Sequence, residues 1–394
     1  MDYRRFTEHA PGTLVQIVTL SGEPGLAFVP ALLPPSLVVD RDIAVAAERA
    51  ALALGNLNGS GRMLPNPTLL YRPFMRREAL ASSRIEGTQA DFDQLVLFEA
   101  SDVEDASDPD VQEVRNYLAA LDSGWTKPVE RQYSPGFLME LHRQLLQGVR
   151  GSNMSPGSLR NVQVHIGVAG QPLTQARFVP PPPDFVRELL ENLCVYIEQS
   201  DNLPSLVRLA VIHYQFETIH PFMDGNGRLG RLLMPIILGH WGLLELPLLY
   251  LSEYFEDHKR EYVDHLLAVS QQGAWKDWVL FTLDAIEQQA NDAVLRGQQI
   301  LHLREDYRLR YQQKQRGATV LSIVDFLFEQ PALTIRRAAE LSGVTVRAAT
   351  RAIDSLVADG VLREATGQQR NRIFAAPEII AAMSARTPSD ARDR

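Results

Sequence analysis

Two segments of this chain, Ser205–Ile219 and Arg228–Trp241, are apolar on nearly every side and follow each other closely. A helix of that composition lies at the buried centre of a bundle rather than on its surface. Pro235 lies inside the second segment, where it predicts a kink. The pair therefore predicts a mainly helical fold, built around two core helices that a short connection joins.

The connection is unusually polar for a segment between two core helices. Asp-Gly and Asn-Gly are strong turn dipeptides, so a tight turn explains Gly225 and Gly227. A turn does not explain a histidine and two arginines between apolar helices, where charged side chains need partners. The segment reads His220-Pro221-Phe222-Met223-Asp224-Gly225-Asn226-Gly227-Arg228-Leu229-Gly230-Arg231.

The same residues are suited to binding phosphate. Glycines let backbone N–H groups curl around an anion, and the helix that begins near Asn226 points its positive end to the same place. Arg228 and Arg231 share a helix face, so both can reach one polyphosphate. Asp224 suits Mg²⁺, and His220 can act as a general base. The pattern predicts group transfer at a phosphate, and the absence of GxxxxGK[ST] excludes a P-loop enzyme.

A zinc site is the competing interpretation. His213 and His220 lie about two turns apart on one helix face. The sequence has no HExxH motif and no third clustered ligand, and Cys194 is its only cysteine. We therefore interpret His213 as a core histidine. A single cysteine suits a reducing compartment, and no signal peptide or membrane-spanning stretch is apparent, so we expect a cytoplasmic protein with no membrane partner.

Upstream of the core helices, the sequence predicts an irregular N-terminal arm over residues 1–70. It contains one helix, Asp40–Leu57, which the glycine- and asparagine-rich stretch Gly55–Gly61 ends. A helix over Arg72–Glu86 stops at Gly87, because glycine tolerates the backbone of a helix end. The other predicted helices outside the C-terminal region are Ala90–Phe98, Val111–Leu121, Pro135–Leu146, Phe185–Glu198, Tyr254–Ser270 and Trp275–Leu309.

Three further segments separate these helices. Ser101–Asp110 is acidic and is typical of a solvated loop. Val162–Gly167 and Arg177–Val179 predict two short strands around a turn at Gly170–Pro172, which together form a small β-hairpin. The four prolines Pro180–Pro183 then exclude a helix or a central strand.

The C-terminal region predicts a separate unit, a winged helix-turn-helix. Its order is helix, helix, turn, helix and hairpin. Its positive and negative charges nearly balance, unlike the basic surface of most DNA-binding domains, so DNA binding, protein docking and a role in dimer assembly all stay open. The predicted helices are Ala318–Glu329, Thr334–Leu341 and Thr345–Asp359, and the predicted strands are Gly360–Arg363 and Asn371–Phe374.

The segment His220–Arg231 matches the motif HPFx[DE]GNGRxxR of the Fic family at every specified position. Residues 40–300 resemble Fic proteins, which implies a Fic-type helical bundle and transfer of AMP from ATP to a hydroxyl of a target protein. By this resemblance, His220 deprotonates the Ser, Thr or Tyr hydroxyl, Asp224 holds Mg²⁺, and Arg228 and Arg231 meet the β- and γ-phosphates. Tyr262 is a candidate for contact with adenine. The resemblance also assigns target docking to Val164, His165 and Ile166. It implies that Asn226 and the neighbouring N–H groups hold the α-phosphate. The residues to which it assigns ATP binding are Asp224, Gly225, Asn226, Gly227, Arg228, Leu229, Gly230 and Arg231.

A second, shorter motif precedes the first. Ser82 and Glu86 are four residues apart on one predicted helix face, which by itself is typical of a solvated surface. In the Fic family, however, [ST]xxxE[GN] is the inhibitory motif, and Ser82-Ser83-Arg84-Ile85-Glu86-Gly87 matches it. The resemblance implies that Glu86 pairs with Arg231, that Ser82 helps to hold the helix, and that the pair excludes productive ATP.

These patterns together predict four regions. They are an N-terminal arm and inhibitory helix region (1–115), a Fic catalytic core with a bridging helix (116–310), a winged helix-turn-helix domain (318–380) and a disordered tail (384–394). We expect an autoinhibited protein adenylyltransferase and a homodimer that modifies a target protein and itself. The alternatives are a nucleotide-sensing transcriptional regulator and a Fic relative that removes AMP or transfers phosphate.

Overall fold

The computed structural model of the chain has the expected pair of apolar helices at its centre. It describes residues 1–18, 22, 24–62, 68–101, 108–126, 133–167, 173–199, 201–313, 317–368 and 370–385. Helix α7 (Ser205–Ile219) is the predicted one, and α8 (Asn226–His240) begins two residues before the expected start and contains Pro235. Nearly every side chain of both helices is buried, including Leu209, Phe216 and Leu232. The apolar composition of the two segments therefore decides the centre of the fold.

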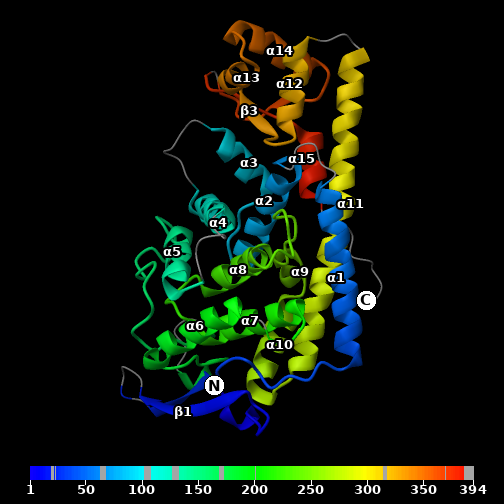
Figure 1. The fold of residues 1–394 in the computed structure, drawn as a ribbon. Helices are drawn as coiled ribbons and strands as arrows, with labels where there is room; N and C mark the ends of the chain where they lie inside the picture. The colour runs from blue at the N-terminus through cyan, green and yellow to red at the C-terminus, as the bar shows by residue number, and fades with distance from the viewer. Residues whose placement is uncertain are drawn as a thin grey trace.

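Nine further helices surround α7 and α8 (Figure 1). They agree with the expected ones to within a few residues, apart from α1 and the α9–α10 pair. Their bounds among the described residues are α1 Arg41–Arg62, α2 Thr68–Ile85, α3 Phe92–Ala100, α4 Pro109–Thr126, α5 Pro135–Leu145, α6 Pro183–Glu198, α9 Ser252–Asp257, α10 Lys259–Gln272 and α11 Trp275–Gln313.

Helix α1 corrects one expectation. The glycine-rich stretch Gly55–Gly61 does not end the helix, which runs to Arg62. Glycine inside a helix costs about 1 kcal/mol relative to alanine. Packing overrides this cost here, because Leu54 and Leu57 are buried and Gly61 packs against Leu246 and Leu248. Helix propensity alone therefore misplaces the end of α1.

The predicted helix Tyr254–Ser270 is wrong in a different way, because it is two helices. His258 has a non-helical backbone and separates α9 from α10. Its ring stacks on Tyr254, and its Nδ1 lies 2.9 Å from the carbonyl oxygen of Tyr254. The side chain thus stabilises the break in the helix. The acidic loop expected at Ser101–Asp110 lies largely outside the described residues.

The N-terminal arm is not irregular. Strands β1 (Gly12–Val18) and β2 (Pro24–Pro30) form an antiparallel hairpin, with Gly12 opposite Pro30. The hairpin packs against the segment around Phe178 through the ring of Phe28, whose centroid lies 6.0 Å from that of Phe178. The sequence did not predict this hairpin, because the proline and glycine residues at the strand ends are unfavourable inside strands.

The hairpin expected over Val162–Gly167 and Arg177–Val179 is only partly present. Ile166 and Phe178 form one isolated antiparallel bridge, and no longer ladder joins the described parts of this segment. The expected turn at Gly170–Pro172 lies outside the described residues. The proline run ends at Pro183, where α6 begins.

The C-terminal region contains four helices and a three-stranded antiparallel sheet with strand order β3-β5-β4. Strand β3 and helix α15 were not expected. Because α15 includes Ser384, the tail cannot begin at this residue as expected. Residues 386–394 lie outside the described residues. The elements are α12 Ala318–Leu327, β3 Ala332–Thr334, α13 Ile335–Ser342, α14 Val346–Ala358, β4 Arg363–Glu364, β5 Ile373–Ala375 and α15 Pro377–Ser384.

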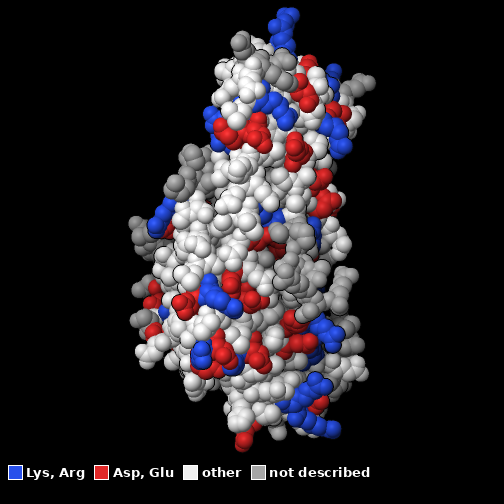
Figure 2. All heavy atoms as spheres, turned by 90° about the vertical axis from the view of Figure 1, so that its right-hand side faces the viewer, with Lys and Arg blue, Asp and Glu red and all other residues white. Residues whose placement is uncertain are grey.

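Helix α11 runs from the helical bundle along one side of the molecule to the C-terminal region (Figure 1). It contacts α12 and α15 there, and Tyr307 of α11 hydrogen-bonds to Glu378 of α15. The expected boundary at residue 115 falls inside α4, so the first two regions share a helix. On the face that Figure 2 draws, lysines and arginines are interspersed with acidic side chains. None of the described helices is long and apolar enough to cross a membrane.

Candidate active site

The loop between α7 and α8 is held in shape by its own side chains. His220 ends α7 with a left-handed backbone (φ 49°), and Gly225 has φ 75° just before α8 begins. The Asn226 side chain closes the loop: its Oδ1 accepts from Phe222 N and its Nδ2 donates to Phe222 O, both at 2.9 Å. One N–H of the side-chain amide and the backbone N–H of Asn226 are left for a phosphate, so its expected role stays a prediction.

The ring of His220 is oriented by the helix that it ends. Its Nδ1 lies 3.3 Å from the carbonyl oxygen of Glu217. If Nδ1 carries the proton of this hydrogen bond, Nε2 keeps its lone pair and can accept a proton. Burial, and then the positive charge of Arg160, lower the pKa of His220 to about 4. The imidazole is therefore neutral near pH 7, which is the form that a general base requires.

His220 opens onto a cavity of about 230 Å³ between α7, α8, α10, the end of α2 and the segments around Ile166 and Phe178. Its lining combines charged side chains with apolar side chains of α10. Of the residues that the sequence singled out, Glu86, Ile166, His220, Gly227, Arg231 and Tyr262 line this cavity. Val164 and His165 lie beside Ile166 and are not part of its lining.

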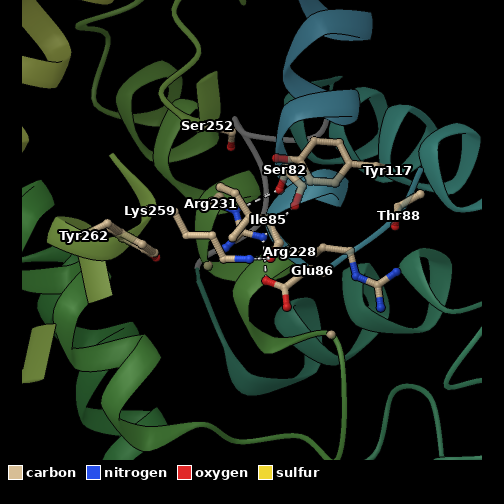
Figure 3. Close-up of polar contacts among 12 residues, drawn as sticks. Ser82, Ile85, Glu86, Thr88, Tyr117, Arg228, Arg231, Ser252, Lys259 and Tyr262 are labelled. Atoms are coloured by element: carbon tan, nitrogen blue, oxygen red, sulfur yellow. Dashed lines mark hydrogen bonds and ion pairs between the residues drawn. The ribbon is translucent and has the colours of Figure 1, made fainter. Parts of the chain in front are cut away.

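Ser82 and Glu86 hold Arg231 at the edge of this cavity (Figure 3). Arg231 Nε donates to Ser82 Oγ at 2.9 Å, and Nη2 donates to Ser82 O at 2.9 Å and to Glu86 Oε1 at 2.7 Å. Burial disfavours the charged form of Glu86, but the charge and hydrogen bond of Arg231 outweigh it and lower the pKa of Glu86. Both groups are therefore charged at neutral pH.

Two glycines, Gly87 and Gly227, allow the Glu86 carboxylate to take its position. Gly87 has φ 98° and turns the chain at the end of α2. A Cβ on Gly227 would lie 2.3 Å from Glu86 Oε1, so only glycine allows the carboxylate to lie over the start of α8. Lys259 Nζ donates to Ile85 O at 2.5 Å, and Arg150 Nη2 donates to Glu86 O at 3.3 Å. Basic side chains thus hold the backbone of this turn.

Arg228 is not part of the cavity lining, although it lies on the same helix as Arg231. It is fully buried, and its Nη1 lies 3.2 Å from Glu113 Oε2. Glu113 also accepts from Thr88 Oγ1 at 2.8 Å. Arg228 Nη2 lies 3.9 Å from Asp224 Oδ1, on a carboxylate that is 40% exposed. A nucleotide in the cavity could meet Arg228 only after this side chain moves.

Tyr262 and His213 form a buried pair behind Arg231. The Tyr262 hydroxyl lies 2.8 Å from His213 Nε2, and His213 Nδ1 lies 3.2 Å from Gly230 O. Burial lowers the pKa of His213 to about 3, so this histidine is neutral. Its interpretation as a core histidine is confirmed. The part of the chain that the structure describes contains no group of three metal-binding side chains.

Sequence reasoning missed Glu113, Arg160 and Glu217. Arg160 is buried beneath His220, and Glu217 lines the cavity three residues before it. Glu217 Oε1 is inaccessible and has no hydrogen-bond partner among the described residues, and burial raises the pKa of Glu217 to about 7. A Cβ on Gly230 would lie 2.1 Å from this oxygen. An acidic residue within one turn of the motif histidine was the available signal for Glu217.

Comparison with protein families gives two matches. Residues 45–126 match the family described as Fic/DOC family N-terminal, and residues 132–238 match the Fic/DOC family itself. The second match contains the whole loop between α7 and α8, and the first contains α2 with Ser82 and Glu86. Both motifs therefore lie inside matched regions.

Among curated proteins, this chain is similar to protein adenylyltransferases. Protein adenylyltransferase fic-1 of Caenorhabditis elegans is 31% identical over 122 residues, which cover 30% of this chain and 22% of that protein. The probable protein adenylyltransferase of Aquifex aeolicus (strain VF5) is 34% identical over 97 residues, or 25% and 28% of the two chains. The matched part therefore spans about a quarter of the length of these relatives.

Among solved structures, a Fic family protein from Desulfovibrio desulfuricans G20 matches with a TM-score of 0.56. The match covers 87% of this chain and 98% of that chain at 22% sequence identity. A Fic domain containing signaling protein from Bacteroides thetaiotaomicron matches with a TM-score of 0.50 and 19% identity, over 65% and 96% of the two chains. At these identities the likeness supports the fold alone.

Proposed function

Because this chain contains a Fic domain preceded by the N-terminal domain of the Fic/DOC family, we propose that it is an autoinhibited protein adenylyltransferase. It transfers AMP from ATP to a Ser, Thr or Tyr hydroxyl of a target protein and releases pyrophosphate. One observation carries the proposal. Arg231 and the neutral His220 face one cavity beside the glycine-rich start of α8, and an ion pair with Glu86 holds the Arg231 guanidinium there. Incubation of the purified protein with labelled ATP tests it.

His220 acts on the target and not on the nucleotide in this proposal. Its Nε2 takes the proton of the hydroxyl while the hydroxyl oxygen forms a bond to the α-phosphorus. The bond from that phosphorus to the bridging oxygen breaks, and the electron pair leaves with pyrophosphate. The contact between Nδ1 and Glu217 O supports this role, because it leaves Nε2 free. In this proposal Val162–Gly167 and Phe178–Pro183 form the target-docking segment. Ile166 lines the cavity, with Val164 and His165 beside it, and an extended target segment could pair with these residues.

In this proposal the first turn of α8 and the arginines of that helix bind the phosphates of ATP. The backbone N–H groups of Asn226, Gly227 and Arg228 lie in the first turn of α8, at its positive end, which favours an anion. Arg231 binds the γ-phosphate once Glu86 leaves it, and Arg228 binds the β-phosphate once it moves from Glu113. Tyr262 lies in the cavity wall with Val263 and Leu266, which suits an adenine ring. While Glu86 stays bound to Arg231, the γ-phosphate would meet a carboxylate instead of a guanidinium, and this accounts for the inhibited state.

The residues at the loop fit Mg²⁺. Asp224 offers a partly exposed carboxylate, and Mg²⁺ in nucleotide sites is held by one or two carboxylates together with phosphate oxygens. When bound, the ion would neutralise charge on the phosphates of ATP. Asp224 would be its one protein ligand, and its Oδ1 is already oriented by the N–H of Gly225 at 2.7 Å.

Alanine in place of Asp224 is expected to lower AMP transfer at least about hundredfold in the Glu86→Gly background, because pyrophosphate leaves with its charge undercompensated. Transfer by the parent should also stop in EDTA and return with added Mg²⁺. The measurement is incorporation of labelled AMP, with Asp184→Ala, an acidic residue of the first turn of α6, as control. Retained transfer by Asp224→Ala in EDTA would remove this role.

Two other activities belong to different classes. A nucleotide sensor that regulates transcription needs phosphate ligands but no base, so the free Nε2 of His220 favours catalysis. A relative that removes AMP could use Glu86 to activate water. The pairing of Glu86 with Arg231 favours inhibition instead, since it holds the carboxylate on the guanidinium. Analysis of an AMP-modified target incubated with this protein distinguishes removal from transfer.

The C-terminal region extends the proposal. We interpret α12, α13, α14 and the β3-β5-β4 sheet as a winged helix-turn-helix domain, with the polar stretch before α12 as its linker. Its exposed arginines include Arg347 and Arg351 on α14, so DNA and an acidic protein surface both remain candidate partners. We further propose that the protein is a homodimer in the cytoplasm.

A further inference from the structure

Arg160 belongs to neither motif, yet it joins the two sides of the candidate active site. It is 3% exposed, and its own N–H donates to Pro221 O at 3.0 Å. Its guanidinium donates to four backbone carbonyl groups, those of His220 at 2.8 Å, Pro181 at 2.5 Å, Ile219 at 3.3 Å and Val162 at 3.3 Å. A single side chain therefore links the end of α7 to both branches of the target-docking segment.

Two of these hydrogen bonds satisfy backbone carbonyl groups at the end of α7. Ile219 and His220 provide carbonyl groups at the C-terminal end of α7, which lack partners within the helix and favour a cation. His220 also has a left-handed backbone, which a non-glycine residue keeps only when its surroundings hold it. We propose that Arg160 is a positioning residue, which fixes the imidazole of His220 against the segment that presents the target. The proposal rests on the proposed function.

Arg160 also acts on His220 through its charge. Its guanidinium disfavours a second positive charge on the imidazole, whereas Glu86 and Asp224 favour one. Glu217, Arg231 and Lys259 line the same cavity and stay unchanged in the variants below. Loss of the Arg160 charge should therefore raise the pKa of His220 toward its ordinary value. The acid limb of the pH–rate profile should then move to higher pH.

The experiment compares Arg160→Gln, Arg160→Lys and the control Arg187→Gln, all in the full-length Glu86→Gly protein. Arg187 is an exposed arginine of α6. We expect Arg160→Gln to raise the pKa of His220, measured by NMR titration, and to lower kcat about tenfold or more at unchanged ATP affinity. Arg160→Lys should keep the pKa low but lose rate, because one ammonium group cannot bond to four carbonyl groups.

An unchanged pKa and an unchanged kcat in folded Arg160→Gln would overturn the proposal. The NMR titration needs no enzymatic activity. If the Glu86→Gly parent transfers no AMP at all, the proposed function fails, while the titration still decides whether Arg160 acts on His220. A folded Arg160→Lys with full activity would show that charge alone suffices and would remove the positioning role.

A second observation concerns α2, the helix that carries Ser82. This helix lies beside the C-terminal region (Figure 1), and two consecutive arginines in its middle bond to that region. Arg76 Nη1 donates to Glu329 O at 3.0 Å, just past the end of α12. Arg77 Nη1 donates to Met383 O at 3.1 Å and Ala385 O at 2.7 Å, at the end of α15. Each arginine therefore caps the C-terminal end of a different helix.

The same two side chains also bind acidic residues outside the C-terminal region. Arg76 pairs with Glu99 of α3 at 2.8 Å, and Arg77 pairs with Glu253 of α9. Both arginines are almost fully buried, so neither can leave its partners without cost. A cavity of about 360 Å³ lies beside this junction, and Arg77, Arg84 and Ser384 are among the residues that line it.

From these contacts we infer that the C-terminal region holds α2 in its inhibitory position. Arg77 lies nine residues before Glu86 on a rigid helix, a rise of about 13 Å. A partner that displaces the C-terminal region would withdraw the caps from α12 and α15 and loosen α2. Glu86 would then leave Arg231. This inference also rests on the proposed function.

The test uses Arg76→Gln and Arg77→Gln in the full-length wild-type and Glu86→Gly proteins, with the exposed Arg72→Gln of the same helix as control. We expect each variant to raise AMP transfer by the wild type about tenfold and to add nothing in the Glu86→Gly background. Arg77→Lys, which keeps the charge beside Glu253, should fall between. Hydrogen exchange along α2 should rise in parallel.

Wild-type transfer and unchanged exchange in folded Arg76→Gln and Arg77→Gln, with Glu86→Gly activated, would contradict the inference. Additional activation in the Glu86→Gly background would also contradict it, since the arginines would then act by another route. If Glu86→Gly itself does not activate, the inhibitory role of Glu86 fails. Hydrogen exchange along α2 would then still show whether the C-terminal region stabilises this helix.

Discussion

Alanine at position 220 is expected to abolish AMP transfer while ATP affinity stays within about twofold of the parent. A general base contributes about 10²–10⁴-fold to rate, and in this account His220 removes a proton from the target and does not bind the nucleotide. The comparison is made in the Glu86→Gly protein, where transfer is not inhibited, by labelled AMP incorporation and by calorimetric ATP binding.

His302→Ala is the matched control, because His302 is an exposed histidine on α11. Its transfer should equal that of the parent. Undiminished labelling by His220→Ala would show that the base is another group. The pH dependence gives a second check. Because burial and Arg160 hold the pKa of His220 near 4, transfer by the parent should lose its base only at acidic pH and show no drop near pH 6.5.

Glycine in place of Glu86 is expected to raise AMP transfer by about one to two orders of magnitude. A charge-assisted hydrogen bond contributes about 1.5–3 kcal/mol, and each 1.4 kcal/mol corresponds to about tenfold in rate. The Glu86–Arg231 contact is such a bond, and its loss frees the guanidinium for the γ-phosphate. Transfer of labelled AMP by wild type and variant measures the effect.

Two further variants separate charge from shape. Glu86→Gln keeps the size of the side chain and removes its charge, so it should activate less than glycine. Arg231→Ala should cancel the gain of Glu86→Gly, because both changes act on one contact. Equal labelling by wild type and Glu86→Gly, with both proteins folded, would mean that Glu86 does not inhibit.

The centre of the fold and the site loop could be predicted because their information is local. A helix that is apolar all round has to be buried, which places Ser205–Ile219 without knowledge of any other segment. The motif from His220 to Arg231 likewise carries its turn, its charges and its helix start in consecutive residues. The end of α2 at Gly87 follows from the backbone that only glycine adopts easily.

What could not be predicted depends on distant partners. Glu113 lies far from Arg228 in the sequence, and only the packing of α4 on α8 brings the two together. Arg160 meets carbonyl groups, which leave no trace in residue type. The β1–β2 hairpin was missed because proline and glycine at its ends are also typical of an irregular arm. The hydrogen bonds between the Asn226 side chain and the backbone of Phe222 were likewise not foreseen.

The most direct test of the account is intact-mass spectrometry after incubation with ATP and Mg²⁺. Wild type, Glu86→Gly and Glu86→Gly/His220→Ala are compared at equal concentration. The account predicts that Glu86→Gly gains the mass of one or more AMP groups, that wild type gains far less, and that the double variant gains none. Absence of AMP on Glu86→Gly and on every added protein, or equal modification of the double variant, would contradict it.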